Sequence, residues 1–206
     1  LGTMTAFKGM PYLICGGISV YGTPDALRMI GQGYVAGVIP IPVIILVIVV
    51  IIVAFILNKT TFGRSVFALG GNDEAARLAG INVKAIRGLL YAISGFGAGL
   101  AGVIMCSRLS SGVPNSGTGY EFDTVTACVI GGVSANGGEG KVSGVLCGVL
   151  VIGVLNNGLT LMNINEFYQN IVNGVVLILA ISFDVLQQRQ KARNDKNKMK
   201  ILQMES

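Results

Sequence analysis

Four apolar stretches, separated by polar segments, dominate the pattern of hydrophobic and polar positions along this chain. The first, over residues 40–57, is almost unbroken isoleucine and valine; the others cover residues 85–107, 142–162 and 167–186. Each is about long enough to cross a hydrocarbon core of roughly 30 Å as a helix. Because lipid offers no hydrogen bonds to the backbone, we expect helix even in the β-branched first stretch.

A fifth apolar segment, over residues 123–134, is too short to cross alone, since twelve helical residues rise only about 18 Å. The Gly/Pro/Ser-rich residues 110–122 before it cannot be regular helix throughout, and we expect them to dip into the protein from outside. Irregular backbone at membrane depth requires cover by protein or a water-filled cavity. Residues 112–134 are therefore either a wall of a solute pathway or a distorted structural helix.

Positive charge predicts the orientation, because Lys and Arg concentrate on the cytoplasmic side. If the half-length segment crosses and the loop after residue 57 is inside, twelve basic residues are cytoplasmic, and only Lys8, Arg28 and Arg108 are outside. If it does not cross, five are inside and ten outside. The sequence thus predicts a crossing and a cytoplasmic C-terminus.

These patterns divide the chain into three parts. Residues 1–39 are the end of a preceding helix and an external segment with a short amphipathic helix near residues 25–30. Residues 40–186 form the membrane domain, with a cytoplasmic loop at 58–84, and residues 187–206 form a basic, frayed tail. We expect this tail to contact anionic lipid rather than nucleic acid. The chain starts within an apolar segment and without Met, so we expect it to be the C-terminal portion of a longer protein.

Composition agrees with a membrane protein and excludes several kinds of chemistry. Hydrophobic residues make up 52% and charged residues 12% of the chain, about half the charged fraction of a soluble domain. There is no His, which removes Ser/His and Cys/His catalysis and most zinc sites. The Gly-rich residues 131–141 are not a P-loop, because Ala135 and Val142 stand where Gly and Ser/Thr are needed. We expect no catalytic residue, metal or cofactor.

The most informative polar stretch, residues 70–82, lies in the predicted cytoplasmic loop. Asn72 or Asp73 can cap a short helix, acidic residues suit its first turn, and Gly80 suits its end. Its alanines offer a small-residue surface. Such a helix is either a solvated connector or an element that inserts into a groove on a partner. The candidate partner-binding residues are Asn72, Asp73, Glu74, Ala75, Ala76, Arg77, Gly80 and Ile81.

Polar and small residues inside the apolar segments are weaker candidates. Gly131, Gly132, Asn156 and Asn157 could either hydrogen-bond and pack between helices or line a polar path, and Asn170 and Asn173 raise the same question. We expect Glu121 and Asp123 near the outer entrance and Asp184 near the inner end of the last span. No carboxylate is expected near the middle of the bilayer, which argues against a proton- or sodium-driven carrier.

Glycines four residues apart predict close helix packing, within the chain or between two copies. The pairs are Gly95 with Gly99, Gly140 with Gly144, and Gly144 with Gly148.

Several stretches together resemble the permease subunit of bacterial ATP-binding-cassette (ABC) importers for ribose and related simple sugars, with autoinducer-2 permeases close by. The match covers about residues 1–186, in the family's order. The stretches are Thr60-Thr61-Phe62-Gly63-Arg64, Gly70 to Ile81, Gly117-Thr118-Gly119-Tyr120-Glu121, Val129 to Ser134 with Gly137 to Gly140, and Gly153 to Gly158.

The resemblance implies an all-α polytopic membrane protein with about four full transmembrane helices, one half-length helix and a cytoplasmic coupling helix, in the bacterial cytoplasmic membrane. It implies a second permease copy, separate ATPase subunits that hydrolyse ATP, an extracytoplasmic sugar-binding protein, and residues 72–81 held in a cleft of the ATPase. The competing hypotheses are a secondary carrier or channel, which would work without the ATPase, and a non-transporting structural membrane subunit.

Overall fold

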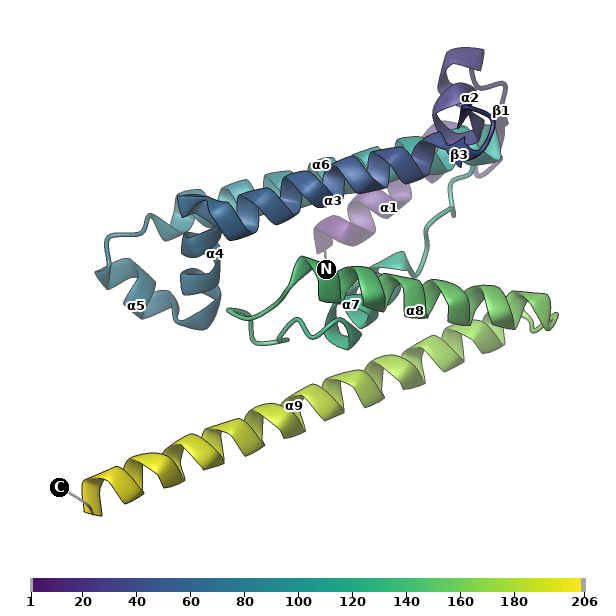
Figure 1. The fold of residues 1–206 in the computed structure, drawn as a ribbon. Coiled ribbons are helices and arrows are strands. Elements are labelled where there is room, and N and C mark those ends of the chain that lie inside the picture. The colour runs from purple at the N-terminus through teal and green to yellow at the C-terminus, as the bar shows by residue number, and fades with distance from the viewer. Residues whose placement is uncertain (1, 205–206) are drawn as a thin grey trace. The chain divides into compact units, whose positions relative to one another are not determined.

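The computed structural model describes residues 2–204, with the backbone alone for Glu166 and residues 187–204. Helices make up most of it (Figure 1). The chain forms two compact units, the first from Leu1–Arg64 with Ile81–Thr118, and the second from Ser65–Gly80 with Gly119–Ser206. Each unit therefore combines segments that are distant in the sequence.

The first unit holds two long apolar helices and the segments that flank them. Helix α3 has no buried residue and consists almost wholly of Ile, Val and Leu, as expected for a helix whose solvent is lipid. The short amphipathic helix α2 lies between β1 and β2, close to the position predicted near residues 25–30. The elements are α1 (Gly2–Cys15), β1 (Val20–Tyr21), α2 (Asp25–Gln32), β2 (Tyr34–Val35), β3 (Ile39–Pro40), α3 (Ile41–Lys59), α6 (Val83–Leu109) and β4 (Ser111–Gly112).

Helix α2 packs against the C-terminal end of α6 through a fully buried serine. Ser107 accepts a hydrogen bond from the Gly31 backbone N–H at 2.7 Å and donates one to the carbonyl of Leu27. A Cβ at position 31 would lie 2.6 Å from the Ser107 hydroxyl, so only Gly allows this approach. The contact fixes the segment before α3 to the end of a spanning helix.

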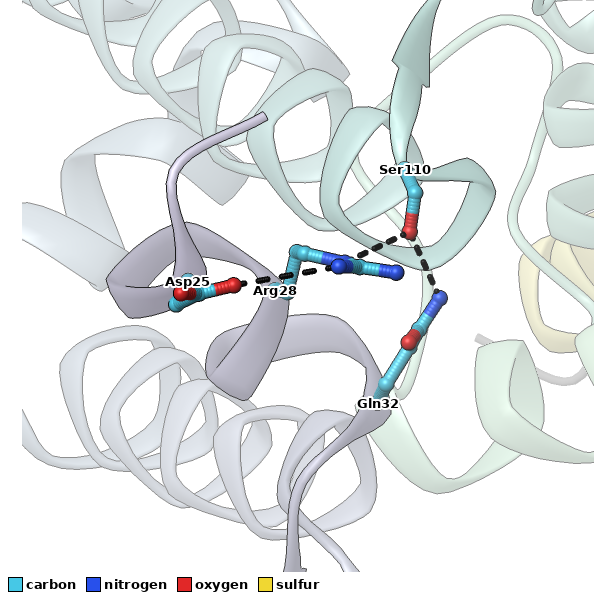
Figure 2. A network of polar contacts seen from close by, with 4 residues as sticks. All are labelled: Asp25, Arg28, Gln32 and Ser110. Atoms are coloured by element: carbon cyan, nitrogen blue, oxygen red, sulfur yellow. Dashed lines mark hydrogen bonds and ion pairs between the residues drawn. The ribbon is translucent and has the colours of Figure 1, made fainter. Parts of the chain in front are cut away.

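A second set of polar contacts joins α2 to the residue that follows the C-terminal end of α6 (Figure 2). Arg28 Nε and Gln32 Nε2 donate to the Ser110 hydroxyl at 3.2 and 2.9 Å, and Arg28 also lies 3.7 Å from Asp25. These groups are exposed, so each contact contributes little to stability by itself. Together they orient α2 on α6.

Two short antiparallel ladders complete the first unit. In one, Val20 pairs with Gly112 and Tyr21 with Ser111; in the other, Tyr34 pairs with Pro40. The first ladder joins a segment before α3 to a segment after α6. The segment before α3 and the segment after α6 must therefore lie on the same side of the membrane, which agrees with α3 and α6 each crossing it once.

The second unit contains α4 (Thr61–Gly71, from Ser65 onward), α5 (Asp73–Leu78), α7 (Tyr120–Ile130), α8 (Val142–Leu161) and α9 (Glu166–Met204). Helix α7 packs against both α8 and α9. In Figure 1 the long helices α8 and α9 converge at their connecting turn.

The contact between α7 and α8 depends on small residues from both helices. A Cβ at Gly131 would lie 2.5 Å from the Gly144 carbonyl oxygen, and a Cβ at Gly148 would overlap the carbonyl of Ala127. The two helices thus run antiparallel with backbones in contact. Gly144 and Gly148 hold the four-residue spacing that the sequence marks as a packing face.

Four helices are long and apolar enough to cross a membrane, at 41–59, 83–109, 142–161 and 167–186, and this confirms the predicted spans. Among the described residues only a few side chains are buried, and many large apolar ones are exposed. Without a bilayer present, this is the surface expected of a protein whose spanning helices face lipid.

Three details differ from the sequence-based expectations. The Gly- and Pro-rich composition of residues 8–39 favours turns, but α1 continues through Pro11 to Cys15, so the first part of that stretch is helical. The half-length helix begins and ends earlier than predicted, because Gly119 and Gly132 adopt positive φ angles on either side of it. Finally, α9 continues to Met204, where we expected fraying, since Gln, Arg, Lys and Ala favour helix. The side chains of that basic tail lie outside the described residues.

Candidate functional site

Helix α5 is a short helix whose start is set by one side chain. The Asn72 Oδ1 atom accepts hydrogen bonds from the backbone N–H groups of Glu74 and Ala75, both at 3.0 Å. This is the geometry of an N-cap, and the acidic residues Asp73 and Glu74 lie in the positive first turn. Local sequence therefore specifies α5 without help from a hydrophobic core.

The surface of α5 is open except on one side. Ala76 is 3% exposed and Leu78 is 88% exposed, while Ala75 and Arg77 are also exposed. Gly80, at φ +81°, ends the segment in the left-handed region that favours glycine. Of the predicted partner-binding residues, Ala76 is therefore turned into this chain, whereas its neighbours on α5 are exposed.

A second feature lies immediately before α5, where the end of α4 rests on the Gly-rich turn between α7 and α8. A Cβ at Gly137 would lie 2.9 Å from the Gly70 carbonyl oxygen, and one at Gly138 would lie 2.7 Å from the Gly71 nitrogen. Both turn glycines have positive φ, at +89° and +77°. We call this backbone contact the glycine joint; it requires glycine at Gly70, Gly137 and Gly138.

A hollow of about 590 Å³ adjoins the glycine joint. It is lined by Phe67 of α4, by the turn residues Glu139 and Lys141, and by glycines that include Gly131 and Gly132. Gly132 thus lies at the surface of this hollow, whereas Gly131 also contacts α8.

Inside the second unit, three polar side chains from three helices meet. Asn156 of α8 donates to Asp123 Oδ2 at 3.2 Å, and Asn173 of α9 donates to Asp123 Oδ1 at 2.9 Å. We expected Asp123 near the outer entrance; its carboxylate lies between two spanning helices, α8 and α9. Asn157, the neighbour of Asn156, is exposed and takes no part in this group.

The structure therefore brings together some predicted site residues and separates others. Gly131 and Asn156 both join α7 to α8, at different levels, while Asn72 to Gly80 form a separate surface. Sequence reasoning missed the glycine joint and the role of Asp123. Two signals in the sequence were available. One is the paired glycines at 70–71 and 137–138; the other is the acidic residue Asp123 in a short helix, followed by the amide residues Asn156 and Asn173 in the next two spans.

Comparison with known proteins identifies relatives over most of this length. A family model described as "Branched-chain amino acid transport system / permease component" matches residues 7–181. The chain is 43% identical over 186 residues to the ribose import permease protein RbsC of Bacillus subtilis, covering 89% of this chain and 58% of the relative. It is 41% identical over 191 residues to the L-arabinose transport system permease protein AraH of Escherichia coli, covering 93% and 58%.

The ribose import permease protein RbsC of Escherichia coli is 46% identical over 160 residues, covering 78% of this chain and 50% of the relative. The chain thus spans about half to three-fifths of the length of the relatives it matches. No solved structure matches it.

Proposed function

This chain belongs to the family of branched-chain amino acid transport system / permease components, and we propose that it is part of the membrane permease of an ABC importer for a simple sugar. The family and the four apolar helices make it a multi-pass inner-membrane protein. Its proposed partners are a second permease copy, cytoplasmic ATPase subunits, an extracytoplasmic sugar-binding protein and membrane lipid. The observation that carries the proposal is α5, an exposed helix that is capped by Asn72 and follows directly on the glycine joint with the turn before α8.

We infer that α5 receives the movement of the ATPase. Its cap by Asn72 keeps it helical while most of its surface is exposed, and Leu78 at 88% exposure is an apolar knob for a groove. Glu74 and Arg77 offer charges of both signs on a helix of six residues. Such an element costs little to bury in a partner, because its backbone hydrogen bonds are already made.

The glycine joint then passes that movement on. It connects the residues just before α5 to the turn just before α8, and α7 in turn packs on α8 and α9. Backbone-to-backbone contacts have no flexible side chain that could absorb a displacement. A push on α5 therefore reaches the half-length helix directly.

The same contacts support the proposed orientation. The glycine joint requires the end of α4 and the turn at residues 131–141 to lie on one side of the membrane, although α6 and α7 intervene. In addition, the Ala135 backbone N–H donates to Asp184 Oδ2 at 3.2 Å, and Asp184 lies near the C-terminal end of the last span. These observations favour a return crossing by α7 and its preceding segment. Charge counting then assigns this side, and the C-terminus, to the cytoplasm.

The coupling proposal is tested in proteoliposomes that hold the full permease, the ATPase and the binding protein. Replacing Glu74 and Arg77 together by Gln should abolish sugar-stimulated ATP hydrolysis and sugar uptake, because the charged surface of α5 is lost while its cap remains. The matched control is Lys84→Gln, which removes a charge from the same loop outside α5. Hydrolysis and uptake unchanged in the double variant would show that α5 is a solvated connector.

The alternative of a secondary carrier predicts a different energy source. In the same vesicles, a secondary carrier would lose uptake when ion gradients are collapsed by ionophores and keep it without ATP. We expect the reverse dependence.

A further inference from the structure

The carboxylate of Asp123 is held by two amides from different spanning helices. Each of its oxygens accepts one N–H, from Asn156 at 3.2 Å and from Asn173 at 2.9 Å. The reverse amide orientation would bring Asn oxygens against the carboxylate and is repulsive, so the carboxylate sets the direction of both amides. Their own oxygens consequently point elsewhere.

Those two amide oxygens lack partners. Asn156 Oδ1 and Asn173 Oδ1 are buried and accept no hydrogen bond from any described residue. Leaving a buried acceptor unsatisfied costs about 1–3 kcal/mol. Two such atoms beside one carboxylate can each accept a hydrogen bond from a group that carries donors.

The group lies within the membrane-spanning part of the helices. At 1.5 Å per residue, Asn156 is about 7 Å from the middle of α8, and Asn173 is about 5 Å from the middle of the span at 167–186. Both lie toward the turn that connects α8 to α9. Ionisable and polar groups at such depth are costly and commonly mark a solute pathway.

We propose that Asp123, Asn156 and Asn173 form a site that recognises the hydroxyl groups of a neutral polyhydroxylated solute as it crosses the membrane; this rests on the proposed sugar permease function. A hydroxyl group donates one hydrogen bond and accepts others. It can therefore donate to an amide oxygen and accept the amide N–H released from the carboxylate. Other hydroxyl groups of the same solute donate to the carboxylate oxygens that the amides have left, so that each of the three side chains keeps a hydrogen-bond partner.

The arrangement also explains how the site would be emptied. When the solute leaves, the amides return to Asp123, which closes α7 onto α8 and α9 as in this structure. The carboxylate thus acts as the internal replacement for solute hydroxyls.

The test compares uptake of D-ribose with that of its 2-, 3- and 5-deoxy analogues by the complete transporter, at saturating binding protein. Wild type is compared with Asn156→Ala and Asn173→Ser. Discrimination by the binding protein is the same for every permease variant and cancels when the uptake ratios are compared. For at least one analogue we expect the ribose-to-deoxyribose ratio to fall about threefold to tenfold, as a lost hydrogen bond predicts. ATP hydrolysis stimulated by the loaded binding protein should persist.

Controls separate recognition from packing. Asn157→Ala, on the same helix but outside the group, should keep the wild-type ratios. The double variant Asp123→Asn with Asn173→Asp retains one carboxylate and two amides. The transporter complex should still assemble, but the uptake ratios should remain altered. Ratios unchanged in both single variants, or fully restored by the double variant, would overturn the site and leave a structural clasp.

Two further outcomes would overturn different claims. Uptake that requires sodium, and loses this requirement in Asp123→Asn, would overturn the hydroxyl site in favour of a cation site. Wild-type complex that hydrolyses ATP but takes up none of the sugars would overturn the proposed function itself.

Discussion

Two glycine-bearing helix faces in this molecule share one spacing and have different surroundings. Gly144 and Gly148 of α8 meet the backbone of α7, whereas a Cβ at Gly95 or Gly99 of α6 would meet no atom within 4 Å in its own unit. The difference lies in the partner helix. Helix α7 carries Ala127 and Gly131 at the same four-residue spacing, so two flat surfaces can approach; α3, the other spanning helix of the first unit, consists of bulky residues.

Within this chain, therefore, a glycine pair packs where the neighbouring helix offers a matching pair of small residues. Each face can be tested by adding side-chain atoms.

The largest effect is expected for Gly148→Leu. Its side chain would overlap the Ala127 carbonyl and force α7 away from α8, at a cost of about 3 kcal/mol or more. Thermal unfolding of the purified chain in detergent measures the loss. The matched control is Gly153→Leu, at a position on the same helix where a Cβ meets nothing within 4 Å. Equal midpoints for the two variants would mean that α7 and α8 are not in backbone contact.

An intermediate effect is expected at the glycine joint. Gly70→Ala places a methyl group against Gly138 and should cost about 1–3 kcal/mol of contact energy. In the transporter we expect less sugar moved per ATP hydrolysed, because the push on α5 no longer reaches α7. Gly71→Ala, one residue along the same helix and free of contacts at its Cβ, is the control and should keep the wild-type ratio. A normal ratio in both would remove the joint from the coupling path.

The smallest effect, with opposite sign, is expected for Gly95→Ala combined with Gly99→Ala. Ala favours helix over Gly by about 1 kcal/mol per residue in aqueous hosts, and these positions offer space. The unfolding midpoint of the isolated chain should stay the same or rise. A fall would show that this face is packed within the chain, as in α8.

Much of this architecture was predictable from sequence because lipid imposes a simple rule. Apolar runs such as residues 41–59 must be helical in a bilayer, and their lengths give the spans. Asn72 and Gly80 were also readable, since capping depends on neighbours a few residues away. The pairing of Asp123 with Asn156 and Asn173 was not, because it depends on the packing of α7 against two later helices. No local pattern reports that pairing.

The glycine joint illustrates the same limit. Gly137 and Gly138 read as a tight turn, which they are, but their contact with Gly70 spans more than sixty positions in the sequence. Nothing in either stretch specifies the other. Only their assembly into one unit shows why both need to be free of side chains.

The ladder between Val20 and Gly112 has a consequence for how the protein is made. Its two strands are separated by two spanning helices, α3 and α6, and by the whole of α4 and α5. At about 5–20 residues per second, a ribosome needs about 5–18 s to synthesise the chain from Val20 to Gly112. During that interval β1 has no strand partner, and the Leu27 carbonyl waits for Ser107. The first unit is therefore completed late, by a segment that emerges only after α5 has been synthesised.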